Sequence, residues 1–326
     1  MGTDAYRVLV AGKIHAAGLD LLRGRKGISV DLVEAVTTEA YRPHLGKADA
    51  VLIRTQPMTA AEIALAPKLK IVSRHGVGYD AVDVNALNAR NIPLTIVGDV
   101  NSRAVAEHTL MLMLAAARRT VANHVASTTG QWNERNRFDA VELDGKTLLL
   151  LGFGRIGRRV AELATAFGMR VTAYDPYVTV DQMKVSGVAA VSNLNAALAS
   201  ADYVSVHMPG GQAPVMGAAE IARMKPTAIL INAARGGVID EPALDLALRE
   251  RLIRAAGLDV LAQEPPPAGN PLLSNPYITL SPHNAGLTEE CAMRMAVAAA
   301  QNILDCIDGR LNPVLVVNQT ALSKAS

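Results

Sequence analysis

The sequence predicts an α/β protein of two domains, each built on a doubly wound parallel sheet. Three observations lead to this fold class. Short β-branched segments alternate with amphipathic segments along most of the chain, as in parallel sheets covered by helices. The 326 residues, half of them hydrophobic, exceed what one compact core usually holds. A glycine-rich turn also follows one of the apolar segments in the second half of the chain.

Five strands are expected in the first hundred residues, followed by one long helix. The strands cover residues 7–12, 28–33, 50–54, 70–74 and 93–97, with helices between them at 60–66 and 81–89. The long helix runs from about 102 to 128, and its apolar positions are dense enough for burial on several sides. These positions are Val105, Leu110, Leu112 and Leu114. A polar loop at 130–143 carries the only tryptophan, Trp132.

A second series of segments supplies six or seven more strands, enough for a complete doubly wound sheet. They lie at 147–151, 170–175, 188–192, 203–207, 228–232, 255–260 and 278–283. The last helix, 288–308, then has to return to the first domain. We therefore expect one domain from residues 1–99 and 287–326, and another from residues 100–286. A cleft between two domains is a common place for a ligand, so we expect the active site there.

The composition excludes several classes of function. Acidic and basic residues nearly cancel, 30 against 32, so no strong field recruits nucleic acid or an anionic membrane. Cys291 and Cys306 have neither metal-ligand spacing nor a disulfide framework, which fits a reducing compartment. We recognise no secretory signal, and the longest apolar helical stretch falls short of the ~20 residues that span a membrane. We expect a soluble, cytoplasmic protein without a metal site.

The glycine-rich turn predicts a dinucleotide site. Gly152, Gly154 and Gly157 match G-x-G-x-x-G directly after an apolar strand and before a helix, the context of a Rossmann-like domain. Such glycines permit the tight turn, the approach of a pyrophosphate and close helix packing, while the helix N-terminus offers amides to the phosphates. Asp175 ends the next strand, where an acid binds the ribose hydroxyls and favours NAD over NADP. An ordinary glycine-rich turn is the alternative, which this context disfavours.

Three polar residues follow successive strands of the second domain and predict the chemistry. Arg235, Glu264 and His283 should converge, because the carboxyl ends of such strands line the ligand crevice. An arginine can hold a substrate carboxylate with two parallel hydrogen bonds. A histidine can exchange a proton with the carbonyl oxygen as a hydride moves, and a carboxylate behind it fixes its tautomer. Each residue alone fits an ordinary loop, but the set indicates a 2-hydroxyacid dehydrogenase.

These motifs resemble the D-isomer-specific 2-hydroxyacid dehydrogenases, most closely the D-3-phosphoglycerate dehydrogenases without their regulatory C-terminal domain. The resemblance covers nearly the whole chain, including segments 74–80, 206–209, 232–241, 257–265 and 270–285. It implies a NAD-dependent enzyme of serine biosynthesis with substrate held by the first domain and cofactor by the second. It also implies a homodimer, whose subunits contact each other through an arm at 101–145 that contains the Trp132 loop.

The resemblance also implies roles for individual residues. Arg235 binds substrate, His283 is the acid and base, and Glu264 is its partner. Cofactor contacts fall at Gly152, Gly154, Arg155, Ile156, Gly157, Tyr174, Asp175, His207, Pro209, Ala233, Arg235, Asp259, His283, Ala285 and Gly286. Substrate contacts fall at Arg54, Arg74, Val77, Gly78, Arg135, Arg235 and His283, with the amides of Val77 and Gly78 cradling the carboxylate.

The substrate and the function class are left with alternatives. Arg54, Arg74 and Arg135, the last from the partner subunit, could bind a substrate phosphate, or they could be structural residues of a hydroxypyruvate or glyoxylate reductase. His75 either contacts substrate or faces solvent. Formate-type relatives pair the histidine with glutamine rather than with an acid such as Glu264. A corepressor that senses NAD(H) is the alternative from another class, although the only tail we recognise is the short segment 318–326.

Overall fold

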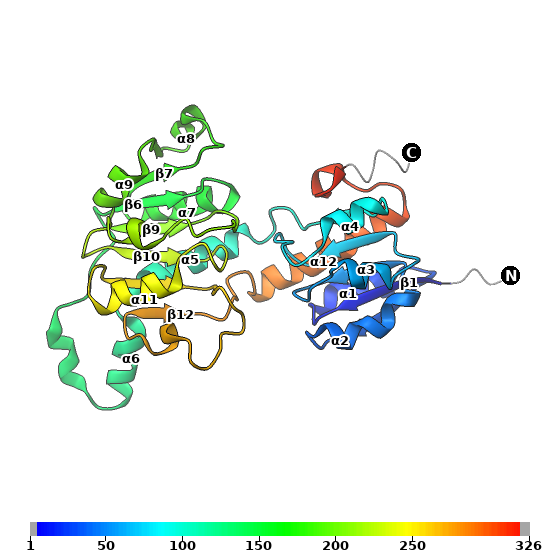
Figure 1. Cartoon of the computed structure of the whole chain (residues 1–326), viewed down its shortest axis with the longest axis horizontal. Coiled ribbons are helices and arrows are strands. Elements are labelled where there is room, and N and C mark those ends of the chain that lie inside the picture. Colours follow the sequence, from blue (N-terminus) through cyan, green and yellow to red (C-terminus); the bar gives the residue numbers. More distant parts are fainter. Residues whose placement is uncertain (1–4, 320–326) are drawn as a thin grey trace. The chain divides into compact units, whose positions relative to one another are not determined.

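The computed structural model describes residues 5–319, which form two compact units (Figure 1). Among these residues, unit 1 takes in the chain up to Asn101 and again from Leu287, and unit 2 takes in Ser102–Gly286. Most of the expected tail, residues 320–326, lies outside the described part. Within that part, none of the helices combines the length and the apolar character needed to cross a membrane.

Unit 1 contains a five-stranded parallel sheet in the order β2-β1-β3-β4-β5. Its strands are β1 (Tyr6–Ala11), β2 (Ile28–Val33), β3 (Ala50–Ile53), β4 (Ile71–Arg74) and β5 (Leu94–Thr95). Its helices are α1 (Ala16–Arg23), α2 (Thr38–Tyr41), α3 (Ala60–Ala64), α4 (Val84–Ala89) and α12 (Glu289–Ile307), with 3-10 turns η1 (Arg42–Lys47) and η4 (Pro313–Leu315).

Unit 2 contains a seven-stranded parallel sheet in the order β12-β11-β10-β9-β6-β7-β8. Its strands are β6 (Thr147–Leu151), β7 (Arg170–Tyr174), β8 (Ala189–Ala190), β9 (Tyr203–Val206), β10 (Ile229–Asn232), β11 (Ala255–Leu258) and β12 (Ile278–Leu280). Its helices are α5 (Ser102–Ala117), α6 (Thr120–Thr128), α7 (Arg155–Ala166), α8 (Val180–Val185), α9 (Leu194–Ser200), α10 (Ala218–Ile221) and α11 (Glu241–Arg249), with 3-10 turns η2 (Trp132–Arg137) and η3 (Pro271–Ser274). The strand order reverses between β1 and β3 in unit 1 and between β6 and β9 in unit 2, so both predicted doubly wound sheets are confirmed.

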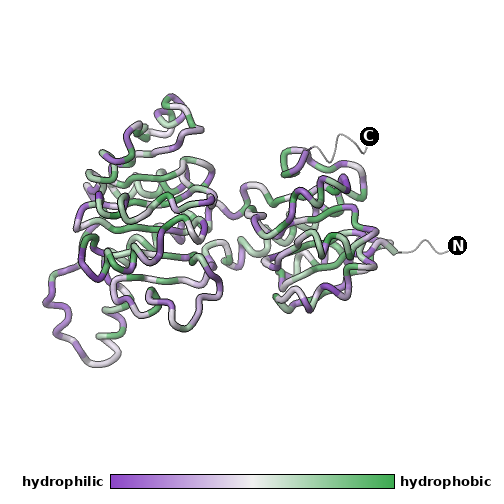
Figure 2. The backbone as a smooth tube through the Cα atoms, viewed as in Figure 1, coloured by the Kyte–Doolittle hydropathy of each residue, from purple (hydrophilic) through white to green (hydrophobic). Residues whose placement is uncertain are grey.

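Both faces of the unit 2 sheet are buried, and β6 shows why. Leu148 and Leu150 belong to one hydrophobic cluster, while Leu149 and Leu151 belong to another. Side chains of a strand alternate between the two faces of a sheet, so a run of leucines fits a strand that helices cover on both sides. Figure 2 shows the same pattern as hydrophobic stretches that follow the strands.

The prediction of a single long helix at 102–128 is wrong. The structure has two helices there, α5 and α6. The division falls at Arg119, which adopts the left-handed conformation with φ of 51°. A residue in the left-handed conformation cannot continue a right-handed helix, so the helix ends there. Eleven residues of α5 are buried, but in α6 only Ala126 is. The helix therefore breaks where its burial in the core ends, and Arg119 forms an ion pair with Asp139 instead.

Two strands are much shorter than expected, and both lie at sheet edges. Strands β5 and β8 have two residues each, against the predicted 93–97 and 188–192. Beyond β5 the backbone leaves the sheet, because the Ile96 amide donates to the Leu315 carbonyl at 3.0 Å and Thr95 bridges to Val316. The segment near the C-terminus thus takes the place of a continued parallel ladder.

The last helix, α12, packs within unit 1 against α1, β3 and β4. The two helices α1 and α12 approach each other closely at Gly18, where a Cβ atom would lie 2.7 Å from the Ala296 carbonyl oxygen. Ser73 of β4 also donates a buried hydrogen bond of 2.8 Å to the Ala299 carbonyl. Residues from both ends of the chain therefore complete one core.

Candidate active site

The three predicted catalytic residues follow three neighbouring strands of the unit 2 sheet. Arg235 comes after β10, Glu264 after β11 and His283 after β12, and these strands are adjacent in the sheet. At Gly236 a Cβ atom would lie only 2.0 Å from the Leu261 carbonyl oxygen. The loop that carries Arg235 therefore packs directly on the loop that leads to Glu264.

His283 and Glu264 are in direct contact. The His283 Nδ1 lies 2.6 Å from the Glu264 Oε2, and the Glu264 Oε1 accepts a 2.9 Å hydrogen bond from the Leu261 amide. Burial alone would raise the pKa of Glu264, but the hydrogen bonds from His283 and Leu261 bring it below its ordinary value. The carboxylate is therefore ionised near neutral pH. It engages Nδ1 and leaves Nε2 as the ring atom available to a reacting oxygen.

Arg235 is held at its backbone by Asn232. The Asn232 side chain donates to the Arg235 carbonyl at 2.8 Å and accepts from the Ala234 amide at 3.0 Å. The Arg235 Nη1 donates to the Ala234 carbonyl at 2.7 Å. These bonds fix the tight turn from which the guanidinium projects, a requirement for any precise grip on a carboxylate.

The hydrogen bonds of the buried Asp259 next to His283, and the part that His108 has in them, could not be predicted from the sequence. The Asp259 carboxylate accepts hydrogen bonds from the Ser281 hydroxyl at 2.7 Å and from the amides of Asn284 and Ala285 at 3.0 Å each. His108 of α5 lies 2.8 Å from the Ser281 Oγ. Burial would raise the pKa of Asp259, but the bonds from His108, Ser281 and the two amides lower it. The sequence marks Asp259 and the 281–286 segment, but it carries no signal that His108 joins them.

The glycine-rich turn has the geometry that a dinucleotide requires. Gly152 has φ of 99°, and a Cβ atom there would lie 2.4 Å from the His207 carbonyl oxygen. At Gly157 a Cβ atom would lie 2.4 Å from the Gly152 carbonyl oxygen, whereas at Gly154 it would meet nothing within 4 Å. Gly154 is also the N-cap of α7 and gives it no side-chain cap. The N-terminus of α7 thus points its backbone donors to a place beside an open glycine, which suits a phosphate.

Asp175, which follows β7, contacts the glycine-rich turn. Its Oδ2 accepts a 2.8 Å hydrogen bond from the Phe153 amide, and its Oδ1 accepts one of 2.8 Å from the Tyr177 amide. The carboxylate thus ties the turn after β6 to the end of β7, in addition to any contact with a ribose. This positioning role was not foreseen from the sequence.

The other predicted cofactor contacts lie on loops at the same edge of the unit 2 sheet. Ala233 and Ala285 share a small hydrophobic cluster with Val105 and Ile156. His207 follows β9 at the reversal of strand order, its Nε2 lies 2.8 Å from the Ser205 Oγ, and burial lowers its pKa to about 4. A neutral imidazole is therefore expected there. The remaining contacts predicted here are Arg155 at the start of α7, Tyr174 at the end of β7, Pro209 after β9 and Gly286 after β12.

Four predicted substrate residues lie in unit 1. Arg54 follows β3 and Arg74 ends β4, and Val77 and Gly78 belong to the loop after β4. His75 between them is only 5% exposed, so the alternative that it faces solvent is wrong. Burial and then the charges of Arg74 and Arg54 lower its pKa to about 4. The positive charges of both arginines thus act on His75 at the carboxyl edge of the unit 1 sheet.

Arg135 is the remaining predicted substrate residue, and it lies in unit 2. It is exposed on η2, the 3-10 turn that follows α6 in the arm at 101–145. Across residues 5–319 the structure shows no group of three or more histidine, cysteine, aspartate or glutamate side chains placed to hold a metal ion.

The chain is similar to known dehydrogenases. Residues 110–285 match the family model described as D-isomer specific 2-hydroxyacid dehydrogenase, NAD binding domain. A D-3-phosphoglycerate dehydrogenase of Methanocaldococcus jannaschii is 37% identical over 94% of this chain, which spans only 58% of that relative's length. The crystal structure of the TT0316 protein from Thermus thermophilus has a TM-score of 0.87 at 33% identity, covering 95% of this chain and 99% of that one. A glyoxylate reductase from Paecilomyes thermophila has a TM-score of 0.85 at 27% identity, covering 97% and 99%. The chain therefore belongs to the D-isomer specific 2-hydroxyacid dehydrogenase family.

Proposed function

We propose that this protein is a NAD-dependent dehydrogenase of small D-2-hydroxy acids. The observation that carries the proposal is the 2.6 Å contact between His283 and Glu264 at the carboxyl edge of a cofactor-binding sheet. A histidine oriented by an ionised carboxylate is suited to exchange a proton with a substrate oxygen. Family membership and the open glycine-rich turn support the same reaction class.

The residues around the glycine-rich turn fit NAD. The backbone amides at the start of α7, those of Arg155 and Ile156, would hold the pyrophosphate, and Gly154 leaves room for it. Asp175 would accept hydrogen bonds from the ribose hydroxyls. Bound NAD supplies the site with hydride transfer to or from the substrate carbon.

The side chains of the chain itself divide the remaining tasks. Arg235 binds the substrate carboxylate through two parallel hydrogen bonds. In the direction of reduction, His283 gives a proton from Nε2 to the carbonyl oxygen, and in oxidation it takes that proton back. Glu264 holds the ring by Nδ1 and stabilises its protonated form. From unit 1, the amides of Val77 and Gly78 are proposed to contact the same carboxylate.

Replacing Gly152 by alanine is expected to abolish tight NADH binding. The new Cβ would collide with the His207 carbonyl, and the φ of 99° is strained for alanine. We expect NADH affinity to fall by about 100-fold or more, corresponding to about 3 kcal/mol, when binding is followed by NADH fluorescence. The matched control is Gly187→Ala, which also has positive φ but meets nothing within 4 Å. An unchanged affinity in Gly152→Ala would contradict the assigned turn.

Replacing Asp175 by alanine is expected to narrow the preference for NAD over NADP and to weaken both cofactors. The preference narrows because the carboxylate no longer repels a 2′-phosphate. Both cofactors weaken, by about tenfold, because the Phe153 amide loses its acceptor. Asp175→Asn is the control that removes the charge but keeps an acceptor for that amide. Steady-state kinetics with both cofactors would contradict the assignment if the ratio stayed the same in both variants.

Among 2-hydroxy acids we propose 3-phosphoglycerate, with phosphohydroxypyruvate as its keto acid, as the substrate pair. The name of the Methanocaldococcus jannaschii relative supports this pair, as does the cationic environment that Arg54 and Arg74 share around His75. A phosphate dianion requires several cations, and we propose that Arg135 of a second subunit adds another. This reaction would belong to serine biosynthesis. The alternative is a hydroxypyruvate or glyoxylate reductase, which the glyoxylate reductase structure supports.

A direct comparison of keto acids tests the proposal. NADH oxidation would be followed by absorbance with phosphohydroxypyruvate, hydroxypyruvate and glyoxylate side by side. We expect the phosphorylated acid to be preferred and the exposed variant Arg135→Gln to raise its KM by about tenfold, with hydroxypyruvate unaffected. A preference for the unphosphorylated acids would establish the alternative. Absence of turnover with every acid, together with intact NADH binding, would favour a NAD(H)-sensing binding protein.

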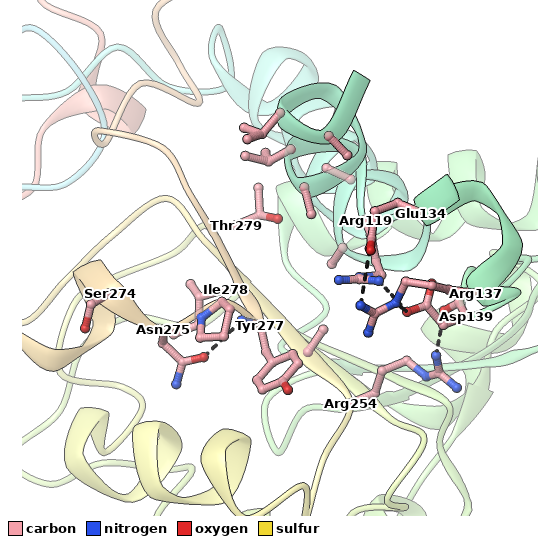
Figure 3. Close-up of a pocket in the computed structure, with 18 of the residues that line it drawn as sticks. Arg119, Glu134, Arg137, Asp139, Arg254, Ser274, Asn275, Tyr277, Ile278 and Thr279 are labelled. Atoms are coloured by element: carbon pink, nitrogen blue, oxygen red, sulfur yellow. Dashed lines mark hydrogen bonds and ion pairs between the residues drawn. The ribbon is translucent and has the colours of Figure 1, made fainter. Parts of the chain in front are cut away.

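We further propose a homodimer in which a second copy of the chain covers the arm. A cavity of about 770 Å³ lies between α6 with η2 on one side and the edge strand β12 on the other (Figure 3). Its walls carry Arg119, Arg137 and Arg254 as well as Glu134 and Asp139, and the arm exposes large apolar residues. These are Val121, Val125, Trp132 and Phe138, the last 90% exposed. A two-fold interface uses one self-complementary patch, and a patch with apolar groups and charges of both signs meets that need.

Light scattering after gel filtration tests the dimer. We expect twice the 34.4 kDa mass of the chain for the wild-type protein and a shift toward the monomer for Val121→Asp with Val125→Asp. Val185→Asp is the control, because Val185 is 89% exposed on α8, outside the arm and the cavity lining. A monomeric wild-type protein would contradict the proposal.

A cytoplasmic location is also proposed, and the two free cysteines support it, because free thiols are typical of a reducing compartment.

A further inference from the structure

A chain of hydrogen-bonded polar side chains, centred on the buried Asp259, connects helix α5 to the loop that carries His283. The His108 Nε2 lies 2.8 Å from the Ser281 Oγ, and the Ser281 Oγ lies 2.7 Å from the Asp259 Oδ1. The His108 Nε2 is also 3.3 Å from the same carboxylate oxygen. The side chain of Asp259 is 1% exposed and that of His108 is 15% exposed. A carboxylate buried so deeply requires donors around it.

The hydrogens in this chain have one consistent order. A serine hydroxyl has a single proton, and the Ser281 hydroxyl donates it to Asp259. The lone pairs of the Ser281 Oγ are then left to accept, so the His108 Nε2 must carry a hydrogen and donate it. The order is therefore an imidazole N–H to a hydroxyl, and the hydroxyl to a carboxylate. His108 acts as a donor at its Nε2.

Asp259 holds the chain on both sides of His283. Its carboxylate binds the Ser281 hydroxyl before His283 and the amides of Asn284 and Ala285 after it. Its backbone carbonyl accepts a 2.8 Å bond from the His283 amide itself. His283 has φ of 50°, a left-handed conformation that residues with side chains seldom adopt. Such a conformation persists where the surrounding bonds enforce it, and here those bonds converge on Asp259.

We propose that His108 is a positioning residue for the proposed reaction: by donating to Ser281 and Asp259 from helix α5, it fixes the 281–286 loop and the direction of the His283 imidazole. It acts through other residues and does not itself exchange a proton with substrate. Helix α5 is a firm base for this role, because its buried residues pack against α7 and strands β10, β11 and β12. Only the kinetic part of the proposal rests on the proposed function.

A pair of variants separates the donor from the volume of the ring. His108→Leu keeps much of the volume but has no donor, whereas His108→Gln offers an amide N–H near the position of Nε2. Hydrogen exchange would be measured for the backbone amides of Asn284 and Ala285, with amides of β6 as internal controls. We expect about tenfold faster exchange of the loop amides in the leucine variant, the size expected when a hydrogen bond is lost, and wild-type exchange in the glutamine variant. Unchanged exchange in the leucine variant, or equal acceleration in both, would overturn the proposal.

A second variant decides the matter if His108→Leu destabilises the whole unit, which would appear as faster exchange in β6 as well. Ser281→Ala removes only the bridging hydroxyl, and it should accelerate the same loop amides while β6 stays protected. Where His108→Leu does fold normally, the double variant should be no worse than either single change, because both break one chain of bonds. Slow, wild-type exchange in Ser281→Ala would overturn the proposal, as would fully additive effects in the double variant.

The kinetic readout is a division between kcat and KM. A misdirected imidazole should lower kcat by about tenfold in His108→Leu, with a much smaller rise in the KM for NADH because the contacts of the glycine-rich turn stay intact. His108→Gln should restore kcat. A leucine variant with wild-type kcat would overturn the positioning role. If the wild-type protein reduces none of the keto acids, the proposed function fails, and the exchange measurement still decides whether His108 holds the loop.

Discussion

Replacing His283 by alanine is expected to lower kcat by about 10²–10⁴-fold, the usual contribution of a positioned acid or base. The proton required at the substrate oxygen would then have to come from water, which lacks the fixed position that Glu264 gives the imidazole. NADH affinity should stay close to that of the wild-type protein, because the glycine-rich turn does not depend on the His283 side chain. Single-turnover absorbance and NADH fluorescence measure the two quantities separately.

Glu264→Gln supplies the companion to this prediction. Glutamine keeps the shape but no longer stabilises a protonated ring, so kcat should fall by about 10–10²-fold, less than for loss of the ring. If the His283→Ala variant turned over at a rate near that of the wild-type protein, the acid and base role would belong to another residue. A glutamine variant slower than the alanine variant would contradict the order of roles.

Replacing Arg235 by alanine is expected to lower kcat/KM for the keto acid by about 10²–10³-fold. The loss corresponds to about 3–4 kcal/mol, as expected when two charge-assisted hydrogen bonds to a carboxylate disappear. Arg235→Lys should recover only a small part, because an ammonium group binds as a point charge and lacks the planar pair of donors. The turn itself should survive, since the Asn232 side chain bonds to the backbone at this position.

The control for Arg235 is the binding of NADH alone, which should change little in either variant. Activity should also be measured with a keto acid and with the matching aldehyde that lacks the carboxylate. The aldehyde should show no difference between the wild-type protein and Arg235→Ala, because it offers nothing for the guanidinium to hold. Equal losses for both substrates would show that Arg235 acts on the carbonyl or on the fold, and not on the carboxylate.

The sheets could be predicted from the sequence because periodicity and burial agree there. The leucine run of β6 sends side chains to two hydrophobic clusters, which is what a strand covered on both faces requires. The same logic fails for the arm. Residues on both sides of Arg119 have helical periodicity, but the helix breaks where its burial in the core ends, and there Arg119 pairs with Asp139, twenty residues away. The local sequence pattern around Arg119 cannot predict such a tertiary contact.

The candidate site shows the same division between what is local and what is not. The proximity of Glu264 and His283 could be predicted because each follows a strand, and neighbouring parallel strands end at one edge of a sheet. His108 could not, because its contact with Ser281 joins residues 173 positions apart. The hydrogen bond from the Phe153 amide to Asp175 could not be predicted either. A carboxylate at the end of a strand predicts a ribose contact, but it does not predict a bond to the glycine-rich turn.

The assembly of unit 1 from both ends of the chain has a consequence during synthesis. Unit 2 is one continuous segment and can close its core as soon as Gly286 has left the ribosome. The sheet of unit 1 is made first, yet the face that receives α12 at Gly18 and Ser73 stays uncovered until the helix follows, after the whole of unit 2. The nascent chain must therefore keep an exposed apolar surface out of aggregates while the second unit folds. We expect a circular permutant that begins at Leu287, with the two original ends joined by a flexible linker, to fold with fewer losses to aggregation than the natural order.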